Sequence, residues 1–297
     1  MKAKKTEVIV VGSINSDSSF LMKHLPGAGE TVLSTKRFDA PGGKGANQAA
    51  ALAALGVSVE FFSAVGNDDP GRELVKNLAG RGVRVEGIVT IASEPTGSAI
   101  ILVSESGENS IIVHVGANGL LTPDHIRTKM TSHASSIILT QLEIPLDAVL
   151  EASKASHAKF IVNPAPMPAQ SLELDQIIEA ADILVPNRSE LAILAGSPIP
   201  ETLAELIECA RKVNFNGQLV VTLGAEGALV FPDGTTGAHK LIPAPQVNTI
   251  DTSGAGDAFC AALTAALARN ETLEDATVSA CEFAAWTTTQ EGAQVPA

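Results

Sequence analysis

Short apolar runs alternate with segments of helical spacing along most of the chain. The apolar runs are rich in Val, Ile and Leu and are typical of buried strands; they cover residues 7–12, 57–66, 136–142, 159–163, 182–185 and 218–223. Between them lie alanine-rich segments with a helical period, at residues 46–55, 71–81, 146–157, 190–195 and 201–213, and two more follow at 254–269 and 273–289. Strands that alternate with helices form mostly parallel sheets with right-handed crossovers, so this pattern predicts an α/β fold.

Three stretches break this alternation. Residues 18–40 hold alternating strand-like positions without a helix, and residues 96–115 predict a hairpin around residues 106–109. We interpret both as a small β layer that stands off the main sheet, and residues 231–240 predict a third hairpin. No repeat or change in composition marks a second full domain, so we expect one domain over residues 1–297 with segments 18–40 and 96–115 inserted as a lid.

Charge and cysteine content narrow the class of protein. The chain has 20 Lys and Arg residues and 33 Asp and Glu residues, a net charge of −13, which argues against a nucleic-acid partner. The three cysteines are widely spaced and fit neither a disulfide framework nor a metal site, which favours a reducing compartment. No apolar run is long enough for a signal peptide or a membrane span, so we expect a cytoplasmic protein without a membrane partner.

The segment DTSGAGDAF at residues 251–259 carries the strongest chemical signal. Gly254, Ala255 and Gly256 open a predicted helix, where unpaired backbone N–H groups and the positive end of the dipole favour an anion. Asp257 lies in the first turn, where a carboxylate can accept a proton beside a transferring phosphoryl group. The alternative is a tight turn with an acidic residue that only complements the helix dipole.

A second glycine-rich segment, GGKGAN, covers residues 42–47. Its glycines allow the backbone to approach a ligand, and Lys44 and Asn47 offer hydrogen-bond donors to sugar oxygens or a phosphate. Phe38 occupies the place of the first glycine of a P-loop, so that motif is absent, and no dinucleotide-binding GxGxxG occurs. The alternative is an ordinary loop before a helix, with a solvated lysine.

Other polar residues follow predicted strands. Asp17, close behind the first strand, could accept hydrogen bonds from two vicinal hydroxyls, although an Asx turn would also explain it. Asn187 and Glu190 match a variant of the helix capping box and could also hold water around a magnesium ion. The glycines around residues 222–227 suit contact with a nucleotide. The histidines show no metal spacing, and no Ser-His-Asp arrangement is readable.

GGKGAN and DTSGAGDAF together resemble the two signatures of the ribokinase (PfkB) family of carbohydrate kinases. GSIN-x-D at residues 12–17, GETV at 29–32, QLE-x-PL at 141–146, NPAP at 163–166 and PN-x-x-E at 186–190 extend the likeness over nearly the whole chain. The resemblance implies a three-layer α/β/α sandwich with a mostly parallel central sheet and a small β-sheet lid.

The resemblance also implies roles for individual residues. Asp257 matches the catalytic base, and Gly254, Ala255 and Gly256 match the anion hole. The other matches fall into three groups: sugar contacts at Asn15, Asp17, Gly43, Lys44, Asn47 and Glu143; nucleotide and magnesium contacts at Asn187, Glu190, Thr222, Gly224 and Gly227; and ligands of a monovalent cation, usually potassium, at Asp251, Ser253, Thr287, Gln290 and Gly292.

The activity implied is ATP- and Mg²⁺-dependent phosphorylation of the 5-hydroxyl of D-ribose. The alternatives are a sibling kinase for 2-deoxyribose, a ketohexose or a nucleoside, and a non-catalytic sugar- or nucleotide-binding regulator. Two residues depart from the family pattern: Cys281 stands where a His or Asn often lies near the adenine, and Pro296 where a serine cation ligand is usual. An exposed β layer also predicts a homodimer joined through the lids, with Ile100, Leu102, Ile111 and Val113 on one apolar face.

Overall fold

The core of the molecule is a nine-stranded sheet in the order β13-β12-β11-β10-β9-β8-β1-β4-β5. The computed structural model describes residues 7–130, 135, 137–155 and 157–295. Seven neighbouring strands run parallel, and β12 and β13 are antiparallel at one edge. The strands are β1 (Val8–Val11), β4 (Val59–Gly66), β5 (Ile88–Ile91), β8 (Ile137–Thr140), β9 (Lys159–Val162), β10 (Ile183–Leu184), β11 (Gln218–Thr222), β12 (Ala228–Phe231) and β13 (Lys240–Ile242).

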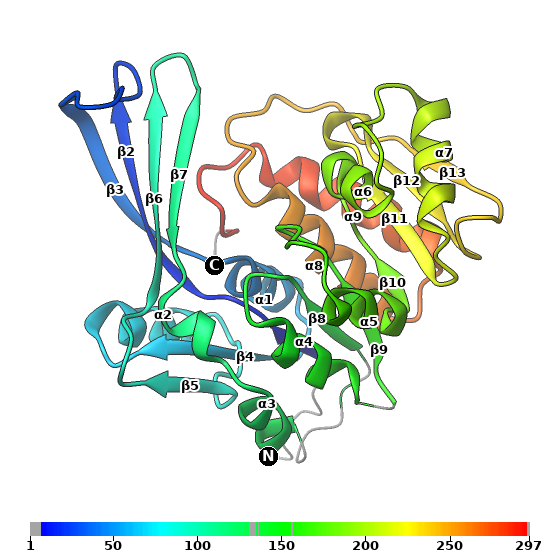
Figure 1. Cartoon of the computed structure of the whole chain (residues 1–297), viewed down its shortest axis with the longest axis horizontal. Coiled ribbons are helices and arrows are strands. Elements are labelled where there is room, and N and C mark those ends of the chain that lie inside the picture. The colour runs from blue at the N-terminus through cyan, green and yellow to red at the C-terminus, as the bar shows by residue number, and fades with distance from the viewer. Residues whose placement is uncertain (1–6, 131–134, 136, 156, 296–297) are drawn as a thin grey trace.

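Helices cover both faces of this sheet and give the predicted three layers (Figure 1). Strand residues alternate between two cores: Val8 and Val10 pack into one, and Ile9 and Val11 into the other. One face is covered by α1 (Lys44–Ala54), α2 (Asp69–Gly80), α8 (Ala255–Ala268) and α9 (Leu273–Thr287). The other is covered by α3 (Pro123–Met130), α4 (Leu146–Ser153), α5 (Leu172–Ala180), α6 (Arg188–Leu194) and α7 (Leu203–Val213).

A second sheet of four strands, in the order β3-β2-β6-β7, projects from the main body at the upper left of Figure 1. Its strands are β2 (Asn15–Met22), β3 (Ser34–Gly42), β6 (Gly97–Ser104) and β7 (Asn109–His114). The small β layer expected from residues 18–40 and 96–115 is therefore present. The hairpin expected at residues 231–240 is also present, as antiparallel β12 and β13 joined by residues 232–239.

The apolar face predicted for the small sheet is wrong in register. Ile100 lies opposite Ile112, and Ile101 lies opposite Ile111. Directly opposed residues share a face and neighbours along a strand alternate, so Ile100 and Leu102 lie on one face and Ile111 and Val113 on the other. An odd number of residues separates Val103 from Asn109, the last pair before the turn. Ile100 and Ile111 would share a face only if that number were even, so β7 is shifted by one position relative to the prediction.

Several elements were not expected from the sequence, namely α3, α5, β5 and the short 3₁₀ segment Gly116–Leu120. Most expected elements begin or end within a few residues of the structural ones. Ser136 and Ser156, which fall in the strand predicted at 136–142 and the helix predicted at 146–157, lie outside the described residues, as does Pro296. No helix among the described residues is long and apolar enough to cross a membrane.

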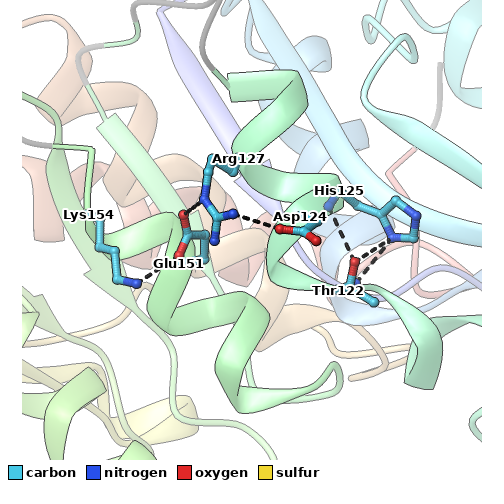
Figure 2. Close-up of polar contacts among 6 residues, drawn as sticks. All are labelled: Thr122, Asp124, His125, Arg127, Glu151 and Lys154. Carbon is cyan, nitrogen blue, oxygen red and sulfur yellow. Dashed lines mark hydrogen bonds and ion pairs between the residues drawn. The ribbon is translucent and has the colours of Figure 1, made fainter.

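An ionic cluster joins α3 to α4 on the outer surface (Figure 2). Arg127 donates to Glu151 over 2.7 Å and to Asp124 over 2.6 Å, and Lys154 donates to the second oxygen of Glu151 over 2.7 Å. The hydrogen bonds from Arg127 and Lys154 lower the pKa of Glu151 to about 2. This cluster fastens the two helices together, and its residues line none of the cavities described below.

Candidate active site

The first turn of α8 is built around a residue that only glycine fits. Gly254 caps the helix with a φ of 70°, and a Cβ there would lie 2.2 Å from the carbonyl oxygen of Ala293. Ala255 and Gly256 follow as the first helical residues and line the adjoining cavities. The backbone N–H groups of this turn are at the positive end of the helix dipole, which makes it a site for an anion.

Asp257 lies in this turn with its side chain buried. One carboxylate oxygen accepts a hydrogen bond from Asn47 over 3.0 Å, and the other accepts one from Gln48 over 3.1 Å. Burial raises the pKa of Asp257 above its ordinary value, and the charge of Lys44 and the two amide donors oppose that rise. The carboxylate is therefore held in one place by α1 while it keeps some affinity for a proton.

The start of α1 brings the GGKGAN residues to the same place. Gly43 has a φ of 86°, and a Cβ there would lie 2.7 Å from the Cα of Ile14, so this position also needs glycine. Lys44 is the first helical residue, partly buried. Burial by itself lowers the pKa of Lys44, but Asp257, Glu143 and Glu190 outweigh it and hold the pKa above its ordinary value. The lysine is therefore a cation surrounded by three carboxylates.

A group of polar side chains lies where β2 begins. Asn15 is buried and accepts a hydrogen bond from Asn118 over 2.8 Å, and Asn118 also binds both backbone groups of Ile14. Asp17 accepts the backbone N–H of Ala99 over 3.1 Å. A Cβ on Gly42 would lie 1.9 Å from a carboxylate oxygen of Asp17, so this glycine leaves room for that side chain.

Glu143 connects this group to Asp257. It accepts hydrogen bonds from the Ser13 hydroxyl and from the backbone N–H of Lys44. Burial raises the pKa of Asp17 to about 6, and the charge of Glu143 adds to that rise. Glu143 also raises the pKa of Asp257, so its carboxylate lies within electrostatic range of both. The sequence-predicted sugar contacts thus form one polar group that reaches from β2 to α8.

Two adjoining cavities lie next to the first turn of α8. One, of about 140 Å³, is lined by Lys44, Asn163, Glu190, Asp257 and the first turn of α8. The second, of about 350 Å³, is mostly apolar and is lined by residues that include Ala244, Pro245, Val247, Phe259 and Cys281. Both cavities share Thr222, Thr252, Ala255 and Gly256, so a ligand can extend from the apolar cavity to Asp257. An apolar cavity that leads to a polar one, lined by Lys44 and the N-terminal turn of a helix, fits a nucleotide with its phosphates.

The residues expected to bind the nucleotide surround these cavities. Asn187 caps α6 in a full capping box with Glu190, whose carboxylate is buried and has a pKa raised by that burial. Thr222 ends β11 and lines both cavities, and Gly224 and Gly227 line the larger one with positive φ values of 60° and 105°. A Cβ on Gly227 would lie 2.0 Å from the carbonyl oxygen of Ile242.

The residues expected to bind a monovalent cation lie next to the anion turn. One oxygen of Asp251 accepts the backbone N–H of Ser253 and the other accepts that of Gly292, over 2.8 and 2.9 Å. Burial by itself raises the pKa of Asp251, but hydrogen bonds from the backbone and side chain of Ser253 and from the backbone of Gly292 outweigh it and hold the pKa below its ordinary value. The carbonyl oxygen of Thr287 accepts the N–H of Gln290 in the turn that ends α9. Asp251 therefore ties the turn before α8 to the loop after α9.

Sequence reasoning missed several residues of this site. Ser13, Gln48 and Asn118 contact the expected residues but were given no role. Gln141 and Asn163 belong to quoted motifs, yet no function was attached to them. Three of them share a positional signal. Gln141 and Asn163 follow directly after β8 and β9, and Ser13 is the second residue after β1, the next strand in the sheet. Polar residues at the carboxyl ends of adjacent parallel strands meet at one edge, where such sheets bind ligands.

The chain is similar in sequence to several proteins named as sugar kinases. The chain is 35% identical over 291 residues to a ribokinase from Haemophilus influenzae, covering 96% of this chain and 93% of that protein. It is 33% identical over 294 residues to a deoxyribokinase from Salmonella typhimurium, covering 97% and 94%. It is 35% identical to a bifunctional ribokinase/ribose-5-phosphate isomerase A from Fructilactobacillus sanfranciscensis, and there the match covers 88% of this chain but 48% of the relative.

Solved structures agree in the same way. A ribokinase from Thermotoga maritima superposes with a TM-score of 0.87 at 32% identity, covering 98% of this chain and 96% of the other. An Arabidopsis thaliana ribokinase complexed with ribose and ATP superposes with a TM-score of 0.85 at 29% identity, covering 98% and 95%. The family model of pfkB family carbohydrate kinases matches residues 5–297. The chain belongs to the pfkB family of carbohydrate kinases.

Proposed function

We propose that this protein transfers the γ-phosphoryl group of ATP to the 5-hydroxyl of D-ribose and releases ribose 5-phosphate and ADP. The observation that carries the proposal is the place of Asp257. Asp257 lies between the polar group suited to a sugar and the two cavities suited to a nucleotide. It is in the first turn of α8, whose backbone N–H groups favour an anion. The relatives named ribokinase, and the ribokinase structure with ribose and ATP, support ribose as the acceptor.

At the sugar end, the polar residues are arranged to accept and donate hydrogen bonds at the same time. Asp17 and Glu143 present carboxylates to hydroxyl groups, and Asn15, Gly43 and Lys44 complete the sugar contacts. The side-chain oxygen of Asn47 is buried and has no hydrogen-bond partner among the described residues, so it is ready to accept one from a sugar hydroxyl. Asp257 then takes the proton of the 5-hydroxyl as that oxygen attacks phosphorus.

At the phosphate end, the positive groups are Lys44 and the N-terminal turn of α8. In the proposal, the backbone N–H groups at Gly254, Ala255 and Gly256 stabilise the developing negative charge, and Lys44 adds a full charge beside them. The N–H of Ala255 also donates to the backbone oxygen of Thr252 over 3.2 Å. The proton moves from the sugar hydroxyl to Asp257, the bond from phosphorus to the bridging oxygen of ADP breaks, and its electron pair stays on ADP. Asn187, Thr222, Gly224 and Gly227 position the nucleotide for this step.

The residues around Glu190 fit a magnesium ion that arrives with the triphosphate. No group of three or more His, Cys, Asp or Glu side chains is placed to hold a metal ion within the described part of the chain. Mg²⁺ needs only one or two protein carboxylates when phosphates and waters supply its other ligands. Glu190, buried near Lys44 and Asp257, supplies one such carboxylate. Mg²⁺ would neutralise phosphate charge.

A monovalent cation, potassium above all, would be held where Asp251 joins the two loops. Asp251, Ser253 and the backbone oxygens of Thr287, Gln290 and Gly292 offer the oxygen ligands. In the proposal, the cation contacts neither the sugar nor the phosphates, and it acts by fixing the conformation of the turn at Gly254. Turnover in an organic-cation buffer, titrated with potassium and then sodium at constant ionic strength, tests this. A flat response to both ions refutes the site, and a response that Asp251→Ala abolishes supports it.

The four-stranded sheet is proposed to act as a lid over the sugar and as the contact between two subunits. Its Asp17 side also carries Phe38, Ile111 and Val113, which are 43%, 55% and 55% exposed. Exposed apolar side chains on a sheet with free edges favour association. A second copy of the chain, related by a two-fold axis, would cover both lids with one interface. The chain would then work as one catalytic domain with segments 18–40 and 96–115 as its lid.

The function is tested by measuring ADP release with ribose, 2-deoxyribose, fructose and adenosine as acceptors. We expect the highest kcat/KM for ribose, and a product whose phosphate is on carbon 5 by NMR. The second candidate acceptor is 2-deoxyribose, which the similarity to the Salmonella deoxyribokinase favours. A higher kcat/KM for 2-deoxyribose would select that candidate, and ADP release with none of the acceptors would contradict a sugar kinase and favour a binding protein.

A further inference from the structure

Three buried carboxamide side chains form a connected group next to Asp257, and one of them, Asn163, also lines the smaller cavity. Gln48 and Gln141 are fully buried, and Asn163 is nearly so. Gln48 belongs to α1, and Gln141 and Asn163 follow β8 and β9. The roles proposed above use none of the three. Burying polar groups costs free energy, so a connected set of them next to the proposed base calls for an explanation.

The three amides are joined to one another and to Asp257. The Gln48 side-chain NH₂ donates to Asp257 over 3.1 Å and makes a longer contact of 3.4 Å with the side-chain oxygen of Asn163. The side-chain oxygen of Gln48 accepts a hydrogen bond from the NH₂ of Gln141. Asn163 donates its own NH₂ to the backbone oxygen of Val185 over 2.8 Å. Both hydrogens and the oxygen of the Gln48 amide are therefore used.

These contacts fix which way round the Gln48 amide points. An ionised carboxylate only accepts hydrogen bonds, so Gln48 has to turn its NH₂ toward Asp257 and its oxygen toward Gln141. Gln141 must then present NH₂ to Gln48, which leaves the Gln141 oxygen buried without a hydrogen-bond partner among the described residues. That oxygen occupies the space of a missing side chain, because a Cβ on Gly12 would lie 2.0 Å from it. The unsatisfied oxygen is the cost of holding the Gln48 NH₂ on Asp257.

We propose that Gln48, oriented by Gln141 and Asn163, is a positioning residue that aims the carboxylate of Asp257 at the sugar hydroxyl. The proposal rests on the function proposed above, because it needs Asp257 to be the base. Asn47 holds one oxygen of the carboxylate from the same helix, and Gln48 holds the other. Two donors on two oxygens fix the plane of the carboxylate, which one donor cannot do. Misplacing a catalytic group by about 1 Å can cost ~10²-fold in rate.

The Gln48 hydrogen bond also favours the ionised form of Asp257. The other titratable groups around Asp257 are Lys44 on α1, Glu143 after β8, Glu190 on α6 and the thiol of Cys260 on α8, whose pKa is raised by burial. Lys44 and the two amides favour the carboxylate, and burial and Glu143 favour the acid. Loss of Gln48 therefore moves the acid limb of the activity profile to higher pH.

The test uses Gln48→Met, which keeps the length of the side chain and removes its donor and acceptor. We expect kcat to fall by ~10-fold to ~100-fold, with the dissociation constants of ribose and ATP unchanged by calorimetry and the acid limb of kcat displaced to higher pH. Thr264→Val is the matched control: Thr264 is fully buried on the same helix as Asp257, with a hydroxyl that has no partner among the described residues. The control should keep wild-type kcat.

Each outcome decides the question. Wild-type kcat in Gln48→Met overturns the proposal, and so does a fall in kcat that is matched by weaker ribose binding. If Gln48→Met does not fold, the same measurements are made on Gln141→Met, which removes the hydrogen bond that orients Gln48. An unchanged kcat and pH profile in Gln141→Met would also overturn the proposal. Asp257→Asn is measured alongside: if it keeps turnover, the proposed base is wrong, whereas an inactive Asp257→Asn with a fully active Gln48→Met removes only the positioning role.

Discussion

Asp17→Asn should weaken the binding of ribose and leave the binding of ATP unchanged. Asp17 is at the start of the small sheet, and its carboxylate accepts the backbone N–H of Ala99. Asparagine has the same shape and keeps one acceptor for that N–H, so we expect the sheet to stay intact. The change removes the negative charge and replaces one acceptor oxygen by a donor. Only interactions that need a carboxylate, such as those with sugar hydroxyls, are lost.

The size of the effect follows from the kind of hydrogen bond. A hydrogen bond to a charged group contributes about 1.5–3 kcal/mol. Losing one such bond to a ribose hydroxyl therefore raises the dissociation constant of ribose by about 10-fold to 150-fold, since ~1.4 kcal/mol corresponds to a factor of ten. The nucleotide cavities contain neither Asp17 nor its contacts, so the dissociation constant of ATP should stay within about 2-fold.

Calorimetry with ribose and with ATP measures both constants. Asp39→Asn is the matched control, because Asp39 is an exposed carboxylate on the neighbouring strand that binds Ser18 and Arg37. Equal losses for ribose and ATP in Asp17→Asn would refute the assignment and make Asp17 structural. Wild-type protein adds a pH test: burial and Glu143 raise the pKa of Asp17 to about 6, so ribose binding should weaken below pH 6 by up to ~tenfold per pH unit. Asp17→Asn should lose that dependence.

Three further predictions concern other parts of the molecule. Gly254→Ala places a methyl group against the carbonyl of Ala293 at a positive φ, so kcat should fall by ~10²-fold in the ADP assay; unchanged kcat would contradict the anion turn. Glu151→Gln should lower unfolding stability by ~1 kcal/mol at pH 7. The pKa of Glu151 is lowered to about 2 in the folded state, so the difference in unfolding free energy between wild type and Glu151→Gln should shrink as the pH falls from 4.5 toward 2. Chemical denaturation at several pH values measures this, and a difference that stays constant would contradict the prediction. Ile111→Lys should give monomers by sedimentation where the wild type gives dimers; an unchanged distribution refutes the lid contact.

The alternation of apolar runs and helical segments predicted the main sheet because buried parallel strands and alanine-rich helices differ strongly in pattern. The short β10, with only Ile183 and Leu184, lies within the apolar run predicted as a strand at residues 182–185. Helix α5 was missed although Ser171 caps it by accepting the N–H of Leu174, because its acidic first turn obscured the apolar spacing. The pairing of Ile100 with Ile112 could not be predicted, since one more or one fewer turn residue changes which side chains share a face.

The candidate site was predicted where one segment carries the chemistry. Asp257 and its glycines are adjacent in sequence, so their common helical turn could be inferred directly. Gln48 and Gln141 are different: their hydrogen bond joins residues 93 positions apart, and its direction depends on Gly12 having no side chain. Contacts of that kind depend on the packing of the whole sheet and cannot be read from spacing alone.

The most direct test of the account is turnover of ribose by Asp257→Asn. The substitution keeps the size of the side chain and removes its ability to take a proton. With saturating ribose and ATP, the account predicts that kcat falls by at least ~10²-fold while calorimetry shows both substrates still bound. A variant that turns over ribose at nearly the wild-type rate would contradict the assignment of Asp257 as the base and the mechanism built on it.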